Sequence, residues 1–227
     1  MKKILITGGT SGIGLATIKK YLINNYEVYT TYCNSKAFNK INGVNYYHLD
    51  LSSKSSIDDL VKILPKIDIL VNNAGICDDD DIFNKTYESI HHVIDVDLTN
   101  TLYLTKEIIK DKLIKGSIIF VSSDNAITEN YPESIEYDAA KSGLIKVSED
   151  LAKYLAPNVR VNTVAPGWVN TNMNIDIDNK FKEEIMHKLL LNRFADPSEI
   201  ANAIYFLTSD DASYINGTTL IVNGGLR

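Results

Sequence analysis

The stretch Ile4-Leu5-Ile6-Thr7-Gly8-Gly9-Thr10-Ser11-Gly12-Ile13-Gly14 decides the fold of this chain. A short apolar run, typical of a buried parallel strand, leads directly into glycines and then into the helical pattern of residues 13–22. Gly8 permits a tight turn, Gly12 lets a phosphate approach the backbone, and Gly14 allows the helix to pack closely on the strand. The glycine spacing differs from the G-x-G-x-x-G fingerprint, and the lysine of a P-loop is missing. The stretch predicts either a dinucleotide-binding turn or an ordinary strand-to-helix turn, and it argues against a nucleoside triphosphatase.

Apolar runs alternate with longer amphipathic patterns along the whole chain, which is typical of parallel strands joined by crossover helices. We expect strands at residues 3–7, 27–31, 45–49, 68–72, 117–122, 160–164 and 219–222. We expect helices at residues 13–22, 57–64, 87–110, 136–155 and 198–208. No linker, repeat or low-complexity block divides the 227 residues. The predicted fold class is therefore α/β: a single domain, residues 1–227, with a Rossmann-type doubly wound sheet of seven parallel strands and helices on both faces.

Composition argues against several classes of protein. The net charge of −6 disfavours nucleic acid or an anionic membrane surface as a partner. No apolar run approaches membrane-spanning length, and residues 4–6 are too short for the hydrophobic region of a signal peptide. Cys33 and Cys77 are the only cysteines, so we expect reduced thiols rather than a disulfide framework or a cysteine-rich metal site. We predict a cytoplasmic protein with no bound metal.

A tyrosine and a lysine suggest proton-transfer chemistry. In Tyr137-Asp-Ala-Ala-Lys141, a phenol and an ammonium lie one turn apart on the same face of a predicted helix. A free tyrosine has a pKa of about 10, so Tyr137 needs a nearby cation to exchange protons at neutral pH. Alone, Tyr137 would be an ordinary amphipathic side chain, but Lys141 and the upstream pair Ser122-Ser123 favour a catalytic site.

Several other segments accompany these two motifs in a fixed order along the chain. They are Asp50-Leu51, Asn72-Asn73-Ala74-Gly75, Pro166-Gly167-Trp168-Val169-Asn170-Thr171 and Asn223-Gly224-Gly225. The ordered set resembles the motifs of the short-chain dehydrogenase/reductase family, in its compact single-domain branch, and the likeness covers essentially the whole chain. This resemblance implies an NAD(P)-dependent oxidoreductase that acts on a C=O or CH–OH group.

The resemblance also implies a set of site residues. The catalytic positions are Ser123, Tyr137, Lys141 and Asp97. The cofactor-binding positions are Gly8, Thr10, Ser11, Gly12, Ile13, Gly14, Asn34, Asp50, Leu51, Asn73, Ala74, Gly75, Tyr137, Lys141, Pro166, Gly167, Val169 and Thr171. In the implied mechanism Tyr137 exchanges a proton with the substrate oxygen and Ser123 hydrogen-bonds that oxygen, while Lys141 lowers the pKa of Tyr137 and holds the nicotinamide ribose.

Two features depart from the family pattern. Ser123 is one residue farther from Tyr137 than the family spacing, which implies a small insertion around residues 129–134. The family usually has asparagine where this chain has Asp97. In one alternative the Asp97 charge favours protonated Lys141 and offsets the positive field that lowers the pKa of Tyr137. In the other, the family's asparagine acts mainly through its backbone, and aspartate at this position has almost no effect on activity. The first alternative suggests a rival hypothesis, a catalytically weak regulatory or scaffold protein that retains the fold and binds the cofactor.

Cofactor choice is expected to depend on the end of the second strand. The stretch Thr30-Thr31-Tyr32-Cys33-Asn34-Ser35-Lys36 has no carboxylate that would repel a 2′-phosphate, and it includes a lysine. These residues favour NADP(H) over NAD(H). Two observations leave the alternative open: Ser11 stands where many NADP-preferring relatives carry arginine, and Lys36 is equally compatible with a solvated surface position.

The substrate is expected to lie under a flap formed by residues 172–191. Trp168, Met173, Ile175 and Phe181 are its possible apolar contacts, with ordinary packing as the alternative. Residues 191–201 resemble 3-oxoacyl-carrier-protein reductases, but the exposed tract predicted at Asp78–Asp81 would repel an acidic carrier. We therefore expect a small-molecule carbonyl or alcohol substrate. The resemblance also implies a homo-oligomer, dimer or tetramer, built from helices 87–110 and 136–155 and the last strand.

Overall fold

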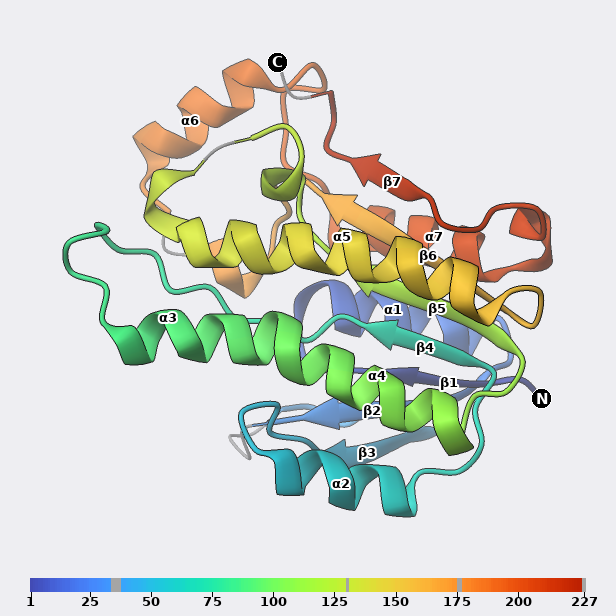
Figure 1. Ribbon diagram of the computed structural model, residues 1–227. Helices are drawn as coiled ribbons and strands as arrows, with labels where there is room; N and C mark the ends of the chain where they lie inside the picture. The colour runs from blue at the N-terminus through green and yellow to red at the C-terminus, as the bar shows by residue number, and fades with distance from the viewer. Residues whose placement is uncertain (34–37, 130, 175–176, 226–227) are drawn as a thin grey trace.

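A parallel sheet covered by helices organises the computed structural model, which describes residues 1–33, 38–129, 131–174 and 177–225 (Figure 1). The strands are β1 (Lys3–Ile6), β2 (Glu27–Tyr32), β3 (Val44–His48), β4 (Ile69–Asn72), β5 (Gly116–Val121), β6 (Val159–Pro166) and β7 (Thr219–Val222). The α-helices are α1 (Gly12–Ile23), α2 (Lys54–Ile63), α3 (Tyr87–Ile94), α4 (Asn100–Asp111), α5 (Ile135–Leu155), α6 (Asn179–Lys188) and α7 (Pro197–Thr208). Among the described residues, no helix is both long enough and apolar enough to cross a membrane.

The strands follow the order β3-β2-β1-β4-β5-β6-β7, and all neighbouring pairs are parallel. Each predicted strand is confirmed, with ends that differ by at most two residues. The chain begins in the middle of the sheet at β1, winds outward to β3, and then crosses back to β4 on the other side of β1. This reversal between β1 and β4 is the switch point at which doubly wound sheets bind their ligands.

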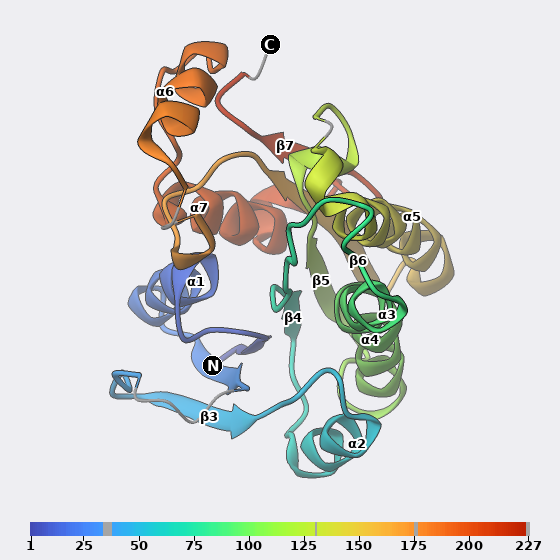
Figure 2. The same cartoon turned by 90° about the vertical axis from the view of Figure 1, so that its left-hand side faces the viewer.

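Helices cover both faces of the sheet, with α1 and α7 on one face and α2, α4 and α5 on the other (Figure 2). Alternation along each buried strand supplies both cores. In β1, for example, Ile4 and Ile6 pack in the core under α1 and α7, whereas Leu5 packs in the core under α2, α4 and α5. Because both faces are buried, the strands appear in the sequence as continuous apolar runs.

The predicted helix at residues 87–110 is interrupted. A π-helix at Asp95–Thr99 separates α3 from α4, and the N–H of Asn100 donates to the carbonyl of Asp95. A π turn inserts an extra residue without changing the apolar pattern much, so the periodicity could not predict it. The interruption turns Asp97 into the interior, where its side chain is fully buried.

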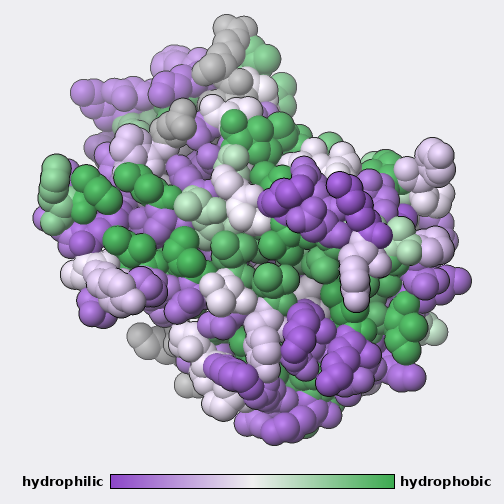
Figure 3. Space-filling model, viewed as in Figure 1, coloured by the Kyte–Doolittle hydropathy of each residue, from purple (hydrophilic) through white to green (hydrophobic). Residues whose placement is uncertain are grey.

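The surface over α3, α4 and α5 carries apolar side chains, seen as green patches in Figure 3. Leu102 of α4 and Ile135 of α5 are exposed, as are Ile82 and Phe83 in the loop before α3. Exposed apolar groups gathered on one face are typical of a surface that contacts another protein.

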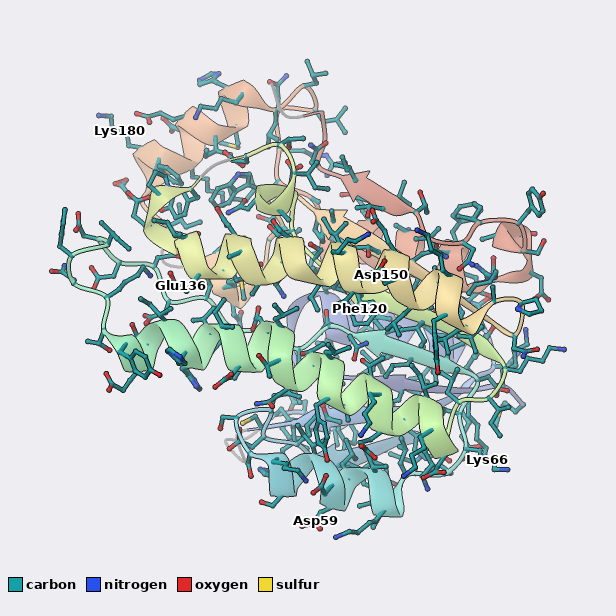
Figure 4. All side chains as sticks on the ribbon, viewed as in Figure 1. Asp59, Lys66, Phe120, Glu136, Asp150 and Lys180 are labelled. Atoms are coloured by element: carbon teal, nitrogen blue, oxygen red, sulfur yellow. The ribbon has the colours of Figure 1, made fainter. Side chains whose placement is uncertain are left out.

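Phe120 of β5 offers a test of the core, because its ring is fully buried among side chains of α4 and α5 (Figure 4). We predict that Phe120→Ala lowers the free energy of unfolding by about 3–5 kcal/mol through lost apolar contact and a residual cavity. Tyr214→Ala is the matched control, since that ring is fully exposed and lies outside this apolar surface. Urea denaturation of both variants measures the difference, and equal losses would contradict the assigned core.

Candidate active site

The glycine turn joins β1 to α1 at the switch point. Gly8 has a φ of 67° and Gly12 a φ of 51°, in the left-handed region that favours glycine. A side chain at Gly14 would collide with the carbonyl oxygen of Gly8, so the helix can pack this closely only with glycine there. The tight turn expected at Gly8 and the close packing expected at Gly14 are therefore both present.

The amino end of α1 is open to a ligand. Ser11 occupies the capping position and is exposed, yet its side chain makes no capping hydrogen bond among the described residues, and the first turn has no acidic residue. The first backbone N–H groups of a helix are unpaired and carry partial positive charge. Together with the bare backbone at Gly12, they fit a diphosphate such as that of a dinucleotide.

The segment after β4 is tied to this turn by side chains. The hydroxyl of Thr7 accepts hydrogen bonds from the N–H groups of Asn73 and Ala74, at 3.0 and 2.9 Å. The Asn73 amide donates to the carbonyls of Thr7 and Gly8, at 2.9 and 3.2 Å. These bonds hold the ends of β1 and β4 together as one surface.

A buried ion pair lies at the end of that segment. The Lys141 ammonium of α5 is 2.9 Å from the Asp97 carboxylate, and the two side chains are 5% and 0% exposed. A Cβ atom on Gly75 would come within 2.8 Å of that carboxylate and 2.9 Å of the ammonium, so any larger residue there would displace the ion pair. The other Asp97 oxygen accepts the N–H of Ile76 at 2.8 Å. Asp97, Lys141 and Gly75, predicted as separate site residues, are thus in direct contact.

Tyr137 lies beside this pair, with its ring centre 5.2 Å from the Lys141 ammonium. Burial raises the pKa of Tyr137; the Lys141 charge opposes that effect, Asp97 and Cys77 add to it, and the Ser123 hydroxyl opposes it. Burial disfavours the charged form of Lys141, but the Asp97 charge and Tyr137 outweigh it, so the pKa of Lys141 is raised. The cation therefore stays protonated, while its effect on the phenol is partly cancelled by Asp97.

The two serines after β5 have different surroundings. Ser122 is buried, and its hydroxyl donates to the Lys141 carbonyl at 2.8 Å, which ties β5 to α5. Ser123 is half-buried and near enough to Tyr137 to lower the pKa of that phenol. Its oxygen also accepts the N–H of Asn125 at 3.3 Å. Of the two, Ser123 is the one that shares the site with Tyr137.

The adenosine side of the predicted cofactor site is partly described. Asp50 follows β3, and one carboxylate oxygen accepts both the N–H and the hydroxyl of Ser52, which lowers the pKa of Asp50. The Leu51 side chain packs in the core, so a ligand contact at that residue would come from its backbone. Asn34 and Lys36, two residues of the cofactor-choice stretch, lie outside the described residues.

The segment after β6, residues 167–171, also lies against the glycine turn. Pro166 pairs with Val222 of β7, and the N–H of Gly167 donates to the Val222 carbonyl at 3.0 Å. Val169 is buried and bridges to Ala195. A Cβ atom on Gly12 would lie 3.1 Å from the Thr171 side chain, so this segment and the turn face each other.

An aromatic cluster joins the predicted flap to the loop before α5. Trp168 lies between Phe181 of α6 and Phe194, with ring centres 5.8 and 5.6 Å away. Tyr131 meets Trp168 edge-on, and the Trp168 indole donates to Glu129 at 3.1 Å. The sequence did not indicate Tyr131 or Glu129, because they lie in the irregular insertion and nothing in their spacing pairs them with Trp168.

Met173 and Ile175, the other two predicted apolar contacts of the substrate, are not among the described residues of this cluster. Met173 is exposed, and Ile175 lies outside the described residues. A cleft of about 760 Å³ opens beside α1, between Gly12, Thr171, Lys182 and the start of α7. Tyr137 and Lys141 do not line this cleft, so it is separate from the ion pair and the phenol.

Comparisons with known proteins agree with this geometry. The family model described as enoyl-(acyl carrier protein) reductase matches residues 8–227. The 3-oxoacyl-[acyl-carrier-protein] reductases of Chlamydia pneumoniae and Aquifex aeolicus are each 35% identical over 99% of this chain, and the matches cover 96% and 97% of those proteins. The chain belongs to the short-chain dehydrogenase/reductase family.

Solved structures of short-chain dehydrogenase/reductases share the whole fold. A family member from Francisella tularensis has a TM-score of 0.90 and 29% identity, covering 99% of this chain and 98% of that one. A 4-hydroxyisoleucine dehydrogenase complexed with NADH has a TM-score of 0.92 and 28% identity, with the same coverage. This short-chain dehydrogenase/reductase is an NAD(P)-dependent oxidoreductase acting on C=O or CH–OH groups.

The Asp97 contact gives a direct prediction for this short-chain dehydrogenase/reductase. Asp97→Asn removes a buried negative charge beside Lys141 and Tyr137, so the pKa of Tyr137 should fall. The tyrosinate absorbance of Asp97→Asn is titrated with pH, and the curve of the Asp97→Asn/Tyr137→Phe double variant is subtracted to isolate Tyr137. A Tyr137 pKa in Asp97→Asn that equals or exceeds the wild-type value would contradict the expected role of the Asp97 charge.

Proposed function

We propose that the protein moves hydride between a nicotinamide cofactor and a ketone or aldehyde, or the corresponding alcohol, with Tyr137 as the acid/base. The observation that carries this proposal is the grouping of three side chains at the carboxyl edge of the sheet. The Lys141 ammonium lies 5.2 Å from the ring centre of Tyr137, and Ser123 is close enough to act on the same phenol. A phenol tuned by a cation beside a hydroxyl donor suits proton transfer to an oxygen whose charge changes.

In the reductive direction the Tyr137 hydroxyl gives its proton to the substrate oxygen, and in the oxidative direction it takes one. Ser123 stabilises the charge on that oxygen through a hydrogen bond. The cofactor supplies or accepts the hydride. The residues that would hold it are the N–H groups at the start of α1, the Asn73–Gly75 segment and Thr171, with Lys141 on the nicotinamide ribose.

Asp97 modifies this chemistry. Because its carboxylate contacts the ammonium, Lys141 stays charged but delivers less positive field to Tyr137. The same ion pair is the observation that favours the rival proposal, a cofactor-binding regulatory or scaffold protein with poor turnover. We favour the enzyme, because Tyr137, Lys141 and Ser123 are grouped in one site.

A turnover assay with purified protein tests the proposal. NADPH or NADH is mixed with a panel of small carbonyl compounds, and the loss of cofactor absorbance is followed. We expect turnover in the wild type and a loss of about 10²- to 10⁴-fold in kcat for Tyr137→Phe, which removes the exchangeable proton.

Cofactor binding is the control for that variant. The cofactor should still bind Tyr137→Phe saturably with at most a modest loss of affinity, since the variant removes one predicted cofactor contact and leaves the glycine turn untouched. Saturable cofactor binding without turnover of any compound would favour the regulatory protein instead.

We propose NADP(H) as the favoured cofactor. The described part of the cofactor-choice stretch, Thr30 to Cys33, presents no carboxylate to a 2′-phosphate. One solved relative, at 28% identity, is complexed with NADH, so NAD(H) is the alternative cofactor for this chain.

The cofactor preference is predicted as a ratio of kcat/KM values. We expect NADPH to exceed NADH by about tenfold, which corresponds to about 1.4 kcal/mol. Lys36→Ala should narrow that ratio by weakening NADPH use while NADH use is unchanged. A higher kcat/KM with NADH than with NADPH would refute the assignment.

We propose a small neutral or weakly charged carbonyl compound or alcohol as the substrate, under a flap formed by residues 172–191. The curated relatives are named as reductases of a carrier-bound substrate. In this chain all four carboxylates of Asp78–Asp81 are exposed, and such a tract repels an acidic carrier. We also propose a homo-oligomer, dimer or tetramer, and the exposed apolar side chains over α3 to α5 support that assembly.

A further inference from the structure

A second buried ion pair lies next to Tyr137, and the proposed mechanism does not use it. The Lys85 ammonium is 2.5 Å from a carboxylate oxygen of Glu136, and the two side chains are only 1% and 4% exposed. Glu136 directly precedes Tyr137 in the first turn of α5 (Figure 4). Burying two charges is costly, and the pair often adds no stability over apolar residues of similar size. A buried ion pair in this position therefore suggests a role other than stability.

Lys85 fastens a whole loop onto α5. Besides Glu136, its ammonium donates to the Asp78 carbonyl at 2.5 Å. The N–H of Asp80 in the same loop donates to the Glu133 carbonyl, just before α5, at 3.0 Å. The loop of residues 76–86 is therefore held against the start of α5 at both its backbone and its side chains.

Among the described residues, the first turn of α5 has no side-chain cap at its N-terminus. Ser134 occupies the capping position, but its hydroxyl donates to the Tyr131 carbonyl at 3.4 Å instead of capping the helix. On the other side of Tyr137, Asp138 accepts the Asn125 amide at 3.1 Å. Tyr137 thus stands between two anchored neighbours, Glu136 held by the loop after β4 and Asp138 held by the loop after β5.

The anchored loop also reaches the ion pair beneath the phenol. Ile76, at its start, donates its N–H to Asp97, which contacts Lys141. One continuous chain of contacts therefore links Lys85 to both partners of the proposed acid/base pair. Small displacements of a reacting group lower rates strongly, by up to about 10²-fold for about 1 Å.

We propose that Lys85 is a positioning residue for Tyr137, acting through Glu136. The inference rests on the proposed role of Tyr137 as acid/base. The Lys85 side chain is buried against Glu136 and Asp78, so it acts on the phenol through Glu136 rather than on the substrate directly. Its ammonium sets the place of the first turn of α5, and so of the phenol, against the loop of residues 76–86.

The test compares Lys85→Met, which keeps the length of the side chain without its charge, with Lys85→Arg, which keeps the charge and the donors. We expect kcat to fall about 10- to 100-fold in Lys85→Met, with the NADPH dissociation constant within about twofold of wild type, because Lys85 contacts Glu136 and Asp78 rather than the glycine turn. Lys85→Arg should recover most of kcat. Glu136→Gln, which keeps an acceptor oxygen, should show a smaller loss and replaces Lys85→Met should that variant fail to fold.

Lys62→Met is the matched control, since Lys62 also pairs with a carboxylate, Asp59 at 2.9 Å, but both side chains are more than 70% exposed. It should leave kcat unchanged. A folded Lys85→Met protein with wild-type kcat would overturn the proposal. So would a parallel loss of NADPH affinity, because that would indicate a general disturbance of the fold.

Hydrogen exchange separates this inference from the proposed function. In Lys85→Met, exchange should accelerate in residues 76–86 and 135–141 but not in residues 8–14. If the wild type turns over no carbonyl compound, the proposed function fails and the exchange pattern alone decides the role of Lys85. Acceleration confined to the first two segments supports positioning, and unchanged exchange overturns it.

Discussion

The burial of one ammonium group, that of Lys141, is the constraint on which the site depends. A buried cation is stable only with a close anion and acceptors for its protons. Asp97 supplies the anion at 2.9 Å, and the Val121 carbonyl at the end of β5 supplies an acceptor at 3.4 Å. The surrounding elements accommodate the pair. The π-helix of residues 95–99 carries Asp97 as a buried residue, and Gly75 leaves room for both side chains.

This constraint links the Tyr137 phenol to the glycine turn between β1 and α1. The segment Asn73–Gly75 touches both, since Asn73 and Ala74 bind Thr7 beside the glycine turn while Gly75 packs on the Asp97–Lys141 pair. Strand order makes this possible, because β1 and β4 are neighbours although residues 7 and 73 are far apart in sequence. A rigid parallel sheet buried on both faces then keeps these groups in register.

The loops after β4, β5 and β6 carry what is particular to this chain. Tyr131 and Trp168 join two of them through aromatic contact, and Lys85 with Glu136 joins the loop after β4 to α5. Function in such folds depends on loops at the carboxyl ends of strands, while the sheet supplies the support. The buried Lys85–Glu136 pair lies one layer beyond the Asp97–Lys141 pair and Tyr137, and it joins that loop to the helix that carries both Tyr137 and Lys141.

The sequence by itself determined the strands, the glycine turn and the identity of most candidate site residues. Those features are local: apolar runs buried on both faces, glycine where φ is positive, and a tyrosine and lysine one helical turn apart. It could not show the π-helix, because one inserted residue barely alters the apolar pattern, nor could it show α6 within the predicted flap. Only the tertiary structure decided that Asp97 contacts Lys141, that Ser122 ties β5 to α5 while Ser123 shares the site with Tyr137, and that Lys85 pairs with Glu136. Each of these contacts joins residues from different elements, and such pairings depend on strand order and helix placement, which no local pattern encodes.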